Sequence, residues 1–261
     1  MHLFSKENRP YWVIGISFLL VFSYWFYLQV LPQKDTLLNY FFNVLVALFY
    51  FFSGVSVLSM CKTTKIGTLK NFFRALGLSL ISWSVGNFCW SYYNIVVQAD
   101  MPYPSVADIF YLLFPVFIGW GFWHLFDLFK FRPSRNNMRI SLIIVSIAYF
   151  AVFIILSKPA FEDDVSVVAT MLNFIYPLTD AFLIALGIIT ITAVNKASRG
   201  IIFITAGLLS QACGDLIFTY QQANNLYWNG NIADLFYLLS AAFIITGIYR
   251  IYAELVNPAS R

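Results

Sequence analysis

The sequence carries the same motif twice. Residues 106–113 read VADIFYLL and residues 232–239 read IADLFYLL, so six of the eight positions are identical and the other two exchange one aliphatic residue for another. A second matched pair precedes each copy, at residues 86–92 and 214–220, where the first glycine and the last tyrosine are identical. The chain is therefore a duplicated unit, and the duplicated segments carry carboxylates.

The composition places these carboxylates in a very apolar protein. Hydrophobic residues make up 60% of the chain, charged residues 11%, and the mean hydropathy is +0.75, whereas soluble domains are about half apolar and about a quarter charged. The apolar runs are continuous rather than alternating, which excludes a β-barrel. The sequence predicts an all-α integral membrane protein, and the basic residues are too dispersed for a nucleic-acid partner.

Apolar segments long enough to cross a bilayer occur eight times, since a helix needs about 20 residues to do so. The first segment is too long for the core of a signal peptide and no small-residue cleavage site follows it, so we expect it to be retained. The predicted spans are residues 11–31, 37–60, 71–97, 105–129, 139–157, 165–194, 200–222 and 231–253.

The distribution of basic residues predicts the orientation of these spans. Of the 16 Lys and Arg residues, all except Lys34 and Lys158 fall in the N-terminus, the C-terminus or every second loop. Basic loops remain on the cytoplasmic side of a membrane. We therefore expect a multi-pass protein of the cell membrane with both termini in the cytoplasm.

An even number of spans per copy gives both copies the same direction through the membrane. The prediction is a 4+4 parallel repeat, residues 1–130 and 131–261, related by a pseudo-two-fold axis along the membrane normal and forming one compact membrane domain. Spans three and seven correspond, as do spans four and eight, while the first two spans of each half are too dissimilar to align. Both motifs then lie in the outer half of the membrane.

The acids Asp108 and Asp234 each follow a capping residue by three positions, Ser105 in the first copy and Asn231 in the second. This spacing is typical of a capping box, in which side chains satisfy the free N–H groups of the first helical turn. Helix capping alone accounts for the duplication of these acids.

A second interpretation of the same acids is functional. Asp108 and Tyr111 share a helical face, as do Asp234 and Tyr237. An acid and a phenol one turn apart can form a polar pocket between the two halves, and capping does not exclude this role.

Asp180 and Asp215 lie deeper within predicted spans. An ionisable group at such depth costs about 2.5–3.5 kcal/mol on insertion scales, and such groups usually face the bundle interior and serve a function. Asp215 stands where the first copy has Asn87, and Asp180 follows Tyr176 and a helix-kinking proline. The structural alternative is a pair of buried acids that hydrogen-bond to neighbouring donors.

The hypothesis for a ligand site therefore combines the duplicated motif with the deeper acids, in a pocket walled by the abundant aromatic residues, which make up 20% of the chain. A lipid, a quinone or another flat ligand suits such walls. The candidate ligand-binding residues are Asn87, Asp108, Tyr111, Tyr176, Asp180, Asp215, Asp234 and Tyr237.

Motifs for other chemistry are missing from the sequence. No Gly-rich phosphate loop, H-E-x-x-H or G-x-S-x-G motif occurs, and catalytic residues are not identified. His124 is the only histidine within a predicted span, and Cys61, Cys89 and Cys213 have no metal or redox spacing. We expect no metal site, and the sequence identifies no cofactor.

The string at residues 103–115, YPSVADIFYLLFP, preceded by GNFCW at residues 86–90, resembles the membrane-embedded N-terminal sensor regions of bacterial and archaeal diguanylate cyclases and histidine kinases. The resemblance implies sensing followed by transfer to a cytoplasmic output domain. No output domain follows in a chain that reaches only Arg261, so we expect a cytoplasmic or membrane signalling partner to supply it. Eight spans with Gly214–Asp215 are also similar to lysoplasmalogenase-type intramembrane hydrolases.

The functional expectation is a sensory or ligand-binding membrane module for a small or lipidic ligand, in contact with membrane lipids and more consistent with a non-enzyme. One alternative is a lipid-modifying hydrolase that uses a carboxylate as general base or as ligand of a divalent metal. The other is a secondary transporter, although only Asp180 lies near the midplane.

Overall fold

The protein is an all-helical bundle over the residues that the structure, a computed structural model, describes: 9–131, 134–160, 166–193 and 198–256. The predicted cytoplasmic residues Lys6, Arg132, Lys196 and Arg261 lie outside these ranges, as does the side chain of Lys158. The helices within them are α1 (Arg9–Val30), α2 (Leu37–Met60), α3 (Gly67–Tyr92), the π-helical turn η1 (Tyr93–Val97), α4 (Val106–Leu128), α5 (Arg135–Ala160), α6 (Val167–Ala193), α7 (Arg199–Ala223) and α8 (Ile232–Leu255).

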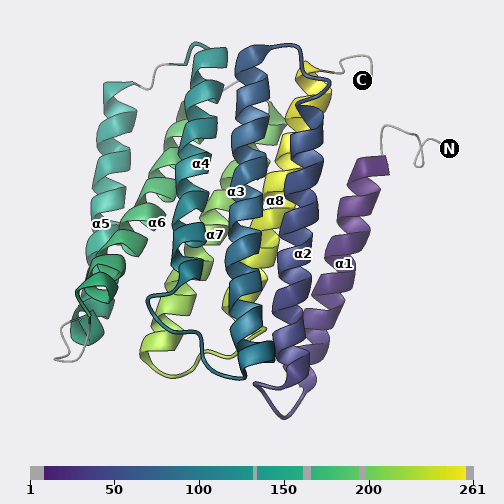
Figure 1. The fold of residues 1–261 in the computed structure, drawn as a ribbon. Helices are drawn as coiled ribbons and strands as arrows, with labels where there is room; N and C mark the ends of the chain where they lie inside the picture. The colour runs from purple at the N-terminus through teal and green to yellow at the C-terminus, as the bar shows by residue number, and fades with distance from the viewer. Residues whose placement is uncertain (1–8, 132–133, 161–165, 194–197, 257–261) are drawn as a thin grey trace.

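The helices run side by side and alternate in direction, so that both chain termini lie at one end of the bundle (Figure 1). We call this the terminal end and the opposite one the distal end. Helices α1 and α5 stand at the two edges of the bundle in this view. Helix α2 packs on α3 and α8, and helix α6 packs on α7 and α4.

Six helices are long and apolar enough to cross a membrane: α1, α2, α4, α6, α7 and α8. The chain is thus a polytopic membrane protein by the length and composition of its helices. Helix α3 contains Lys70 and Arg74 near its start and a mean hydropathy lower than its neighbours, yet it lies between α2 and α4 in contact with both (Figure 1).

Helix α2 has the bounds that the sequence predicts, and α5 extends beyond the predicted span at both ends. The difference at α5 has a simple cause. Hydropathy marks only the segment that suits hydrocarbon, whereas a helix continues into the interface while its backbone hydrogen bonds persist.

The pairs α3–α4 and α7–α8 make matched contacts. A side chain on Gly86 would meet the Tyr111 ring 2.5 Å away, and one on Gly214 would meet the Tyr237 ring 2.6 Å away. The hydroxyl groups repeat the match one turn earlier, because Ser82 donates to the Phe110 carbonyl and Ser210 to the Phe236 carbonyl. The duplicated motif therefore builds the same helix–helix contact twice.

The terminal half of the bundle is closely packed and apolar. Gly200 and Gly247 let α7 and α8 approach until a side chain at Gly200 would lie 2.5 Å from the Gly247 carbonyl oxygen. Large aliphatic and aromatic side chains fill the surrounding space at 0–1% exposure. They include Leu69, Phe72, Phe73, Leu76, Ile201, Ile204, Ile248 and Ile251.

Candidate functional site

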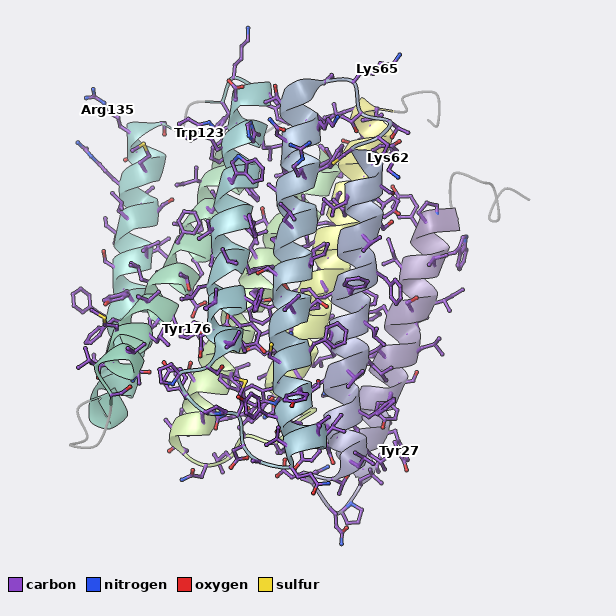
Figure 2. All side chains as sticks on the ribbon, in the orientation of Figure 1. Tyr27, Lys62, Lys65, Trp123, Arg135 and Tyr176 are labelled. Atoms are coloured by element: carbon purple, nitrogen blue, oxygen red, sulfur yellow. The ribbon has the colours of Figure 1, made fainter. Side chains whose placement is uncertain are left out.

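Asp108 combines both interpretations of the duplicated acid. Its Oδ2 accepts the Ser105 N–H at 2.6 Å, which completes a capping box at the start of α4. Its Oδ1 accepts the hydroxyl of Tyr176 from α6 at 2.5 Å, and Figure 2 shows Tyr176 on α6 beside α4. The predicted cap is confirmed, and the phenol that pairs with this acid comes from another helix instead of from Tyr111.

Asp234 occupies the matching position in α8 with a modified cap. Its Oδ2 accepts the Gly230 N–H at 2.6 Å, and the side chain of Asn231 accepts the Ala233 N–H at 2.8 Å. The Tyr227 hydroxyl donates to Asp234 Oδ1 at 3.2 Å. Burial in this loop raises the pKa of Tyr227 well above its ordinary value, and the Asp234 charge adds to the increase.

Asp180 and Asp215 meet in the membrane interior. A side-chain hydrogen bond joins the two carboxyl groups across α6 and α7. Because carboxylates only accept hydrogen bonds, this contact requires a proton on one of the two. Tyr237 from α8 donates its hydroxyl to Asp215 Oδ1 at 2.9 Å, so the phenol of the second motif serves this acid.

The carboxyl pair continues into a polar chain that sequence reasoning missed. Gln211 Nε2 lies 3.4 Å from Asp215 Oδ2, and the buried Tyr50 hydroxyl donates to the Tyr237 carbonyl at 2.8 Å and reaches Gln211 Oε1 at 3.3 Å. The chain thereby links α6, α7, α8 and α2. Gln211, a fully buried amide in an apolar helix, was the available signal for it.

Trp83 lies where the two motifs meet. Its ring centroid is 4.8 Å from that of Tyr111 and 5.2 Å from that of Tyr237, and its indole N–H has no hydrogen-bond partner among the described residues. Tyr111 contributes packing to this arrangement. Asn87 donates to the Trp83 carbonyl at 3.0 Å, a local bond within α3 that leaves it apart from the carboxylates.

The loop between α7 and α8 is tied into the distal end through Asn229, a second feature that sequence reasoning missed. Its side-chain oxygen accepts from Asn43, from Trp90 Nε1 at 2.7 Å and from Asn94 at 3.4 Å. Asn39 donates to its backbone carbonyl at 3.0 Å. Three helical segments thus converge on one loop residue, which is 6% exposed.

The predicted site residues therefore form three hydrogen-bonded groups around an aromatic centre. The groups are Asp108 with Tyr176, Asp234 with Tyr227, and Asp180 with Asp215 and Tyr237. Across the described residues, no cluster of three or more His, Cys, Asp or Glu side chains could hold a metal ion. The chemistry available is proton sharing and hydrogen bonding.

No protein-family model, curated protein or solved structure matches the chain, so its fold and site are interpreted here from its own residues.

Proposed function

We propose that the chain crosses the membrane eight times, with α3 and α5 as the additional spans and the terminal end in the cytoplasm. Lys62, Lys65 and Arg135 all lie at the terminal end (Figure 2), which supports this orientation. At the distal end, Lys34 donates to the carbonyl groups of Leu28 at 2.6 Å and of Gln29 at 3.3 Å.

The 4+4 parallel repeat is part of the same proposal, and reciprocal contacts support it. Asn39 on α2 donates to the loop that precedes α8, and Asn173 on α6 accepts the Tyr103 hydroxyl of the loop that precedes α4 at 2.8 Å. Each asparagine follows a leucine in the second helix of its half. The second helix of each half thus binds the last loop of the other half, as a pseudo-two-fold axis requires.

The function that this geometry supports best is a sensory or ligand-binding module, and the polar chain around Asp180 and Asp215 carries the argument. A ligand that bonds to this pair replaces hydrogen bonds that join α6, α7, α8 and α2. Such differential contacts shift the balance between two packings of the halves. The closely packed terminal half favours reception over passage, and a signalling partner at the cytoplasmic face receives the change.

Ligand-dependent stabilisation tests this function. The purified protein is melted in a mild detergent with fractions of a membrane extract, beside the Asp180→Asn/Asp215→Asn double variant. These substitutions keep the side-chain volume and remove the ionisable groups. We expect one or more fractions to raise the melting temperature of the unsubstituted protein and to leave the double variant unshifted. The exposed Asp127 provides the matched control, Asp127→Asn.

The outcomes separate the proposal from loss of folding. Circular dichroism must give the same helical content for the double variant and the unsubstituted protein. Equal shifts in both proteins, or no shift with any fraction, contradict the proposal. Cysteine accessibility from each membrane side, at Lys65→Cys and Gln98→Cys in a background without the native cysteines, tests the orientation separately.

The carboxyl pair also favours a second candidate, hydrolysis of a lipid. Two aspartates that share one proton can act as acid and base on a water molecule. Release of fatty acid or aldehyde from lipid substrates by the unsubstituted protein, lost in either Asp→Asn variant, is the test, together with metal analysis of the purified protein. Proton- or sodium-driven flux in liposomes tests the transporter alternative, against which the sealed terminal half argues.

A further inference from the structure

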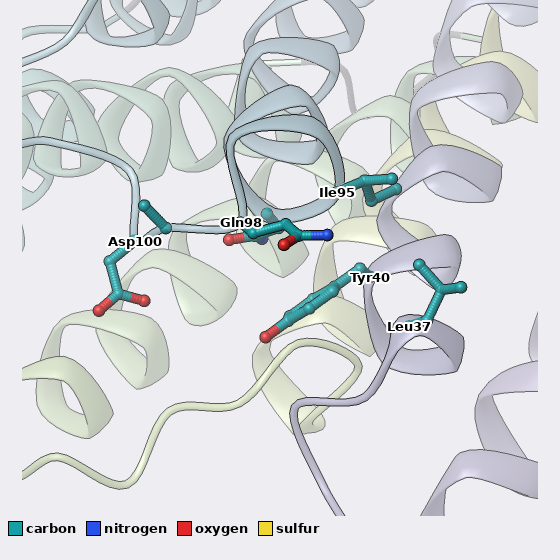
Figure 3. A pocket seen from close by; sticks show the side chains of 7 residues that line it. Leu37, Tyr40, Ile95, Gln98 and Asp100 are labelled. Atoms are coloured by element: carbon teal, nitrogen blue, oxygen red, sulfur yellow. The ribbon is translucent and has the colours of Figure 1, made fainter.

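A cleft of about 500 Å³ opens at the distal end, where α2 begins and η1 ends. Figure 3 shows Tyr40, Gln98 and Asp100 around this opening, with Leu37 and Ile95 at one side. Asn94 and Ala99 complete the lining. None of the predicted site residues lines it, so the cleft is separate from the carboxyl pair.

The local backbone explains how the cleft forms. The turn after α3 is a π-helix, and π-helical turns occur frequently at functional sites. Gln98 ends this turn with φ 56° and ψ 41°, a left-handed conformation that side chains other than glycine and asparagine rarely adopt. The chain therefore turns away sharply after η1, and the segment that carries Asp100 faces the start of α2.

The polar groups of the cleft have no partners, in contrast to their neighbours. Asn94 is 9% exposed and donates to Asn229, yet its Oδ1 accepts no hydrogen bond from any described residue. The side chains of Tyr40, Gln98 and Asp100 make none within the same ranges. A buried amide oxygen without a donor is costly, so this group is available to a ligand.

The charge in the cleft is negative. The carboxylates of Asp35 and Asp100 both act on the Tyr40 hydroxyl. Lys34, the basic side chain described at this end, is occupied by the α1 carbonyls and by the face of Trp228, 4.3 Å from the ring centroid. No described cation lines the cleft. An acceptor-rich, anionic opening beside a tyrosine ring suits a cation that carries N–H donors.

We propose that this cleft binds the ammonium group of a small organic amine. Asp100 supplies the counter-charge, the amide oxygens of Asn94 and Gln98 accept N–H donors, and the Tyr40 ring faces the cation. Leu37 and Ile95 contact the attached hydrocarbon. The volume lies in the range of about 300–1,000 Å³ typical of small-molecule sites and greatly exceeds what a bare metal ion occupies. The amine is either a free solute or the ethanolamine headgroup of a lipid.

Two arms of one experiment distinguish these sources. The full chain is placed in nanodiscs of phosphatidylcholine and phosphatidylglycerol and titrated with ethanolamine and n-butylamine. In parallel, native mass spectrometry measures retention of phosphatidylethanolamine against phosphatidylcholine. Both arms use Asp100→Asn, which removes the charge, Ala99→Phe, which fills the exposed mouth, and Asp127→Asn, which changes the same charge at the terminal end.

Loss of one charged hydrogen bond predicts an affinity at least about tenfold lower for Asp100→Asn. Saturable binding of soluble amines, weakened in Asp100→Asn and Ala99→Phe and unchanged in Asp127→Asn, supports a free amine. Selective retention of phosphatidylethanolamine with the same pattern supports a lipid headgroup. Absence of both, or equal binding by Asp100→Asn, overturns the site. The Asp180→Asn/Asp215→Asn variant keeps every cleft side chain and so separates this failure from failure of the sensory function.

Discussion

Replacing Asn229 by alanine removes the oxygen on which three buried donors converge. Asn43, Trp90 and Asn94 lose their shared acceptor, while the bond from Asn39 to the backbone carbonyl remains. At about 0.5–1.5 kcal/mol per hydrogen bond, the expected loss is about 2–4 kcal/mol in the free energy of unfolding. The α7–α8 loop thereby becomes detached from α2, α3 and η1.

Equilibrium unfolding in mixed micelles, with a rising fraction of sodium dodecyl sulfate, measures this loss. Asn224→Ala is the matched control, because Asn224 is exposed in the same loop and bonds only to the Tyr220 carbonyl one turn back. A double-mutant cycle sharpens the test: Trp90→Phe should destabilise the unsubstituted protein and cost almost nothing beside Asn229→Ala. Equal stabilities of the Asn229 and Asn224 variants would refute the reasoning.

Three further perturbations have defined outcomes. Gly214→Ala places a methyl group 2.6 Å from the Tyr237 ring, and overpacking predicts a loss of about 1–3 kcal/mol in unfolding free energy. Tyr176→Phe removes the donor to the α4 cap acid and should lower the melting temperature through a loss of about 1–3 kcal/mol. Burial raises the pKa of Tyr227 above 10.0, so only the unfolded chain ionises near pH 10.0, and stability should fall as the pH rises beyond that value.

Each perturbation has a control. Gly15→Ala meets no atom within 4 Å, so its stability should match the unsubstituted protein. Tyr92→Phe alters an exposed tyrosine and should leave the melting temperature unchanged. Melting between neutral pH and pH 12 measures the alkaline effect, which Tyr227→Phe should reduce; an identical alkaline decline in that variant contradicts the assignment.

Much of the fold could be predicted because its signals are local. The apolar segments gave the helix positions, and the spacing of Ser105 and Asp108 gave the capping box that α4 contains. The matched motifs also indicated a repeated helix–helix contact, which Gly86 with Tyr111 and Gly214 with Tyr237 both form. Each of these signals depends only on residues a few positions apart or on direct comparison of two strings.

The partners of the acids could not be predicted in the same way. A helix that is apolar all round carries no stripe to show which face points inward. The rotation of α6 decides that Tyr176 serves Asp108 and that Asp180 serves Asp215.

The sequence alone determined an apolar, duplicated helical chain with acids near its distal helix starts and within its spans. Only the tertiary structure decided which acids share a proton, which loop residue gathers donors from three segments, and where an unpaired cleft opens. The physical reason is that hydropathy and capping act along one helix, whereas a buried hydrogen bond depends on the register and rotation of two helices that pack together.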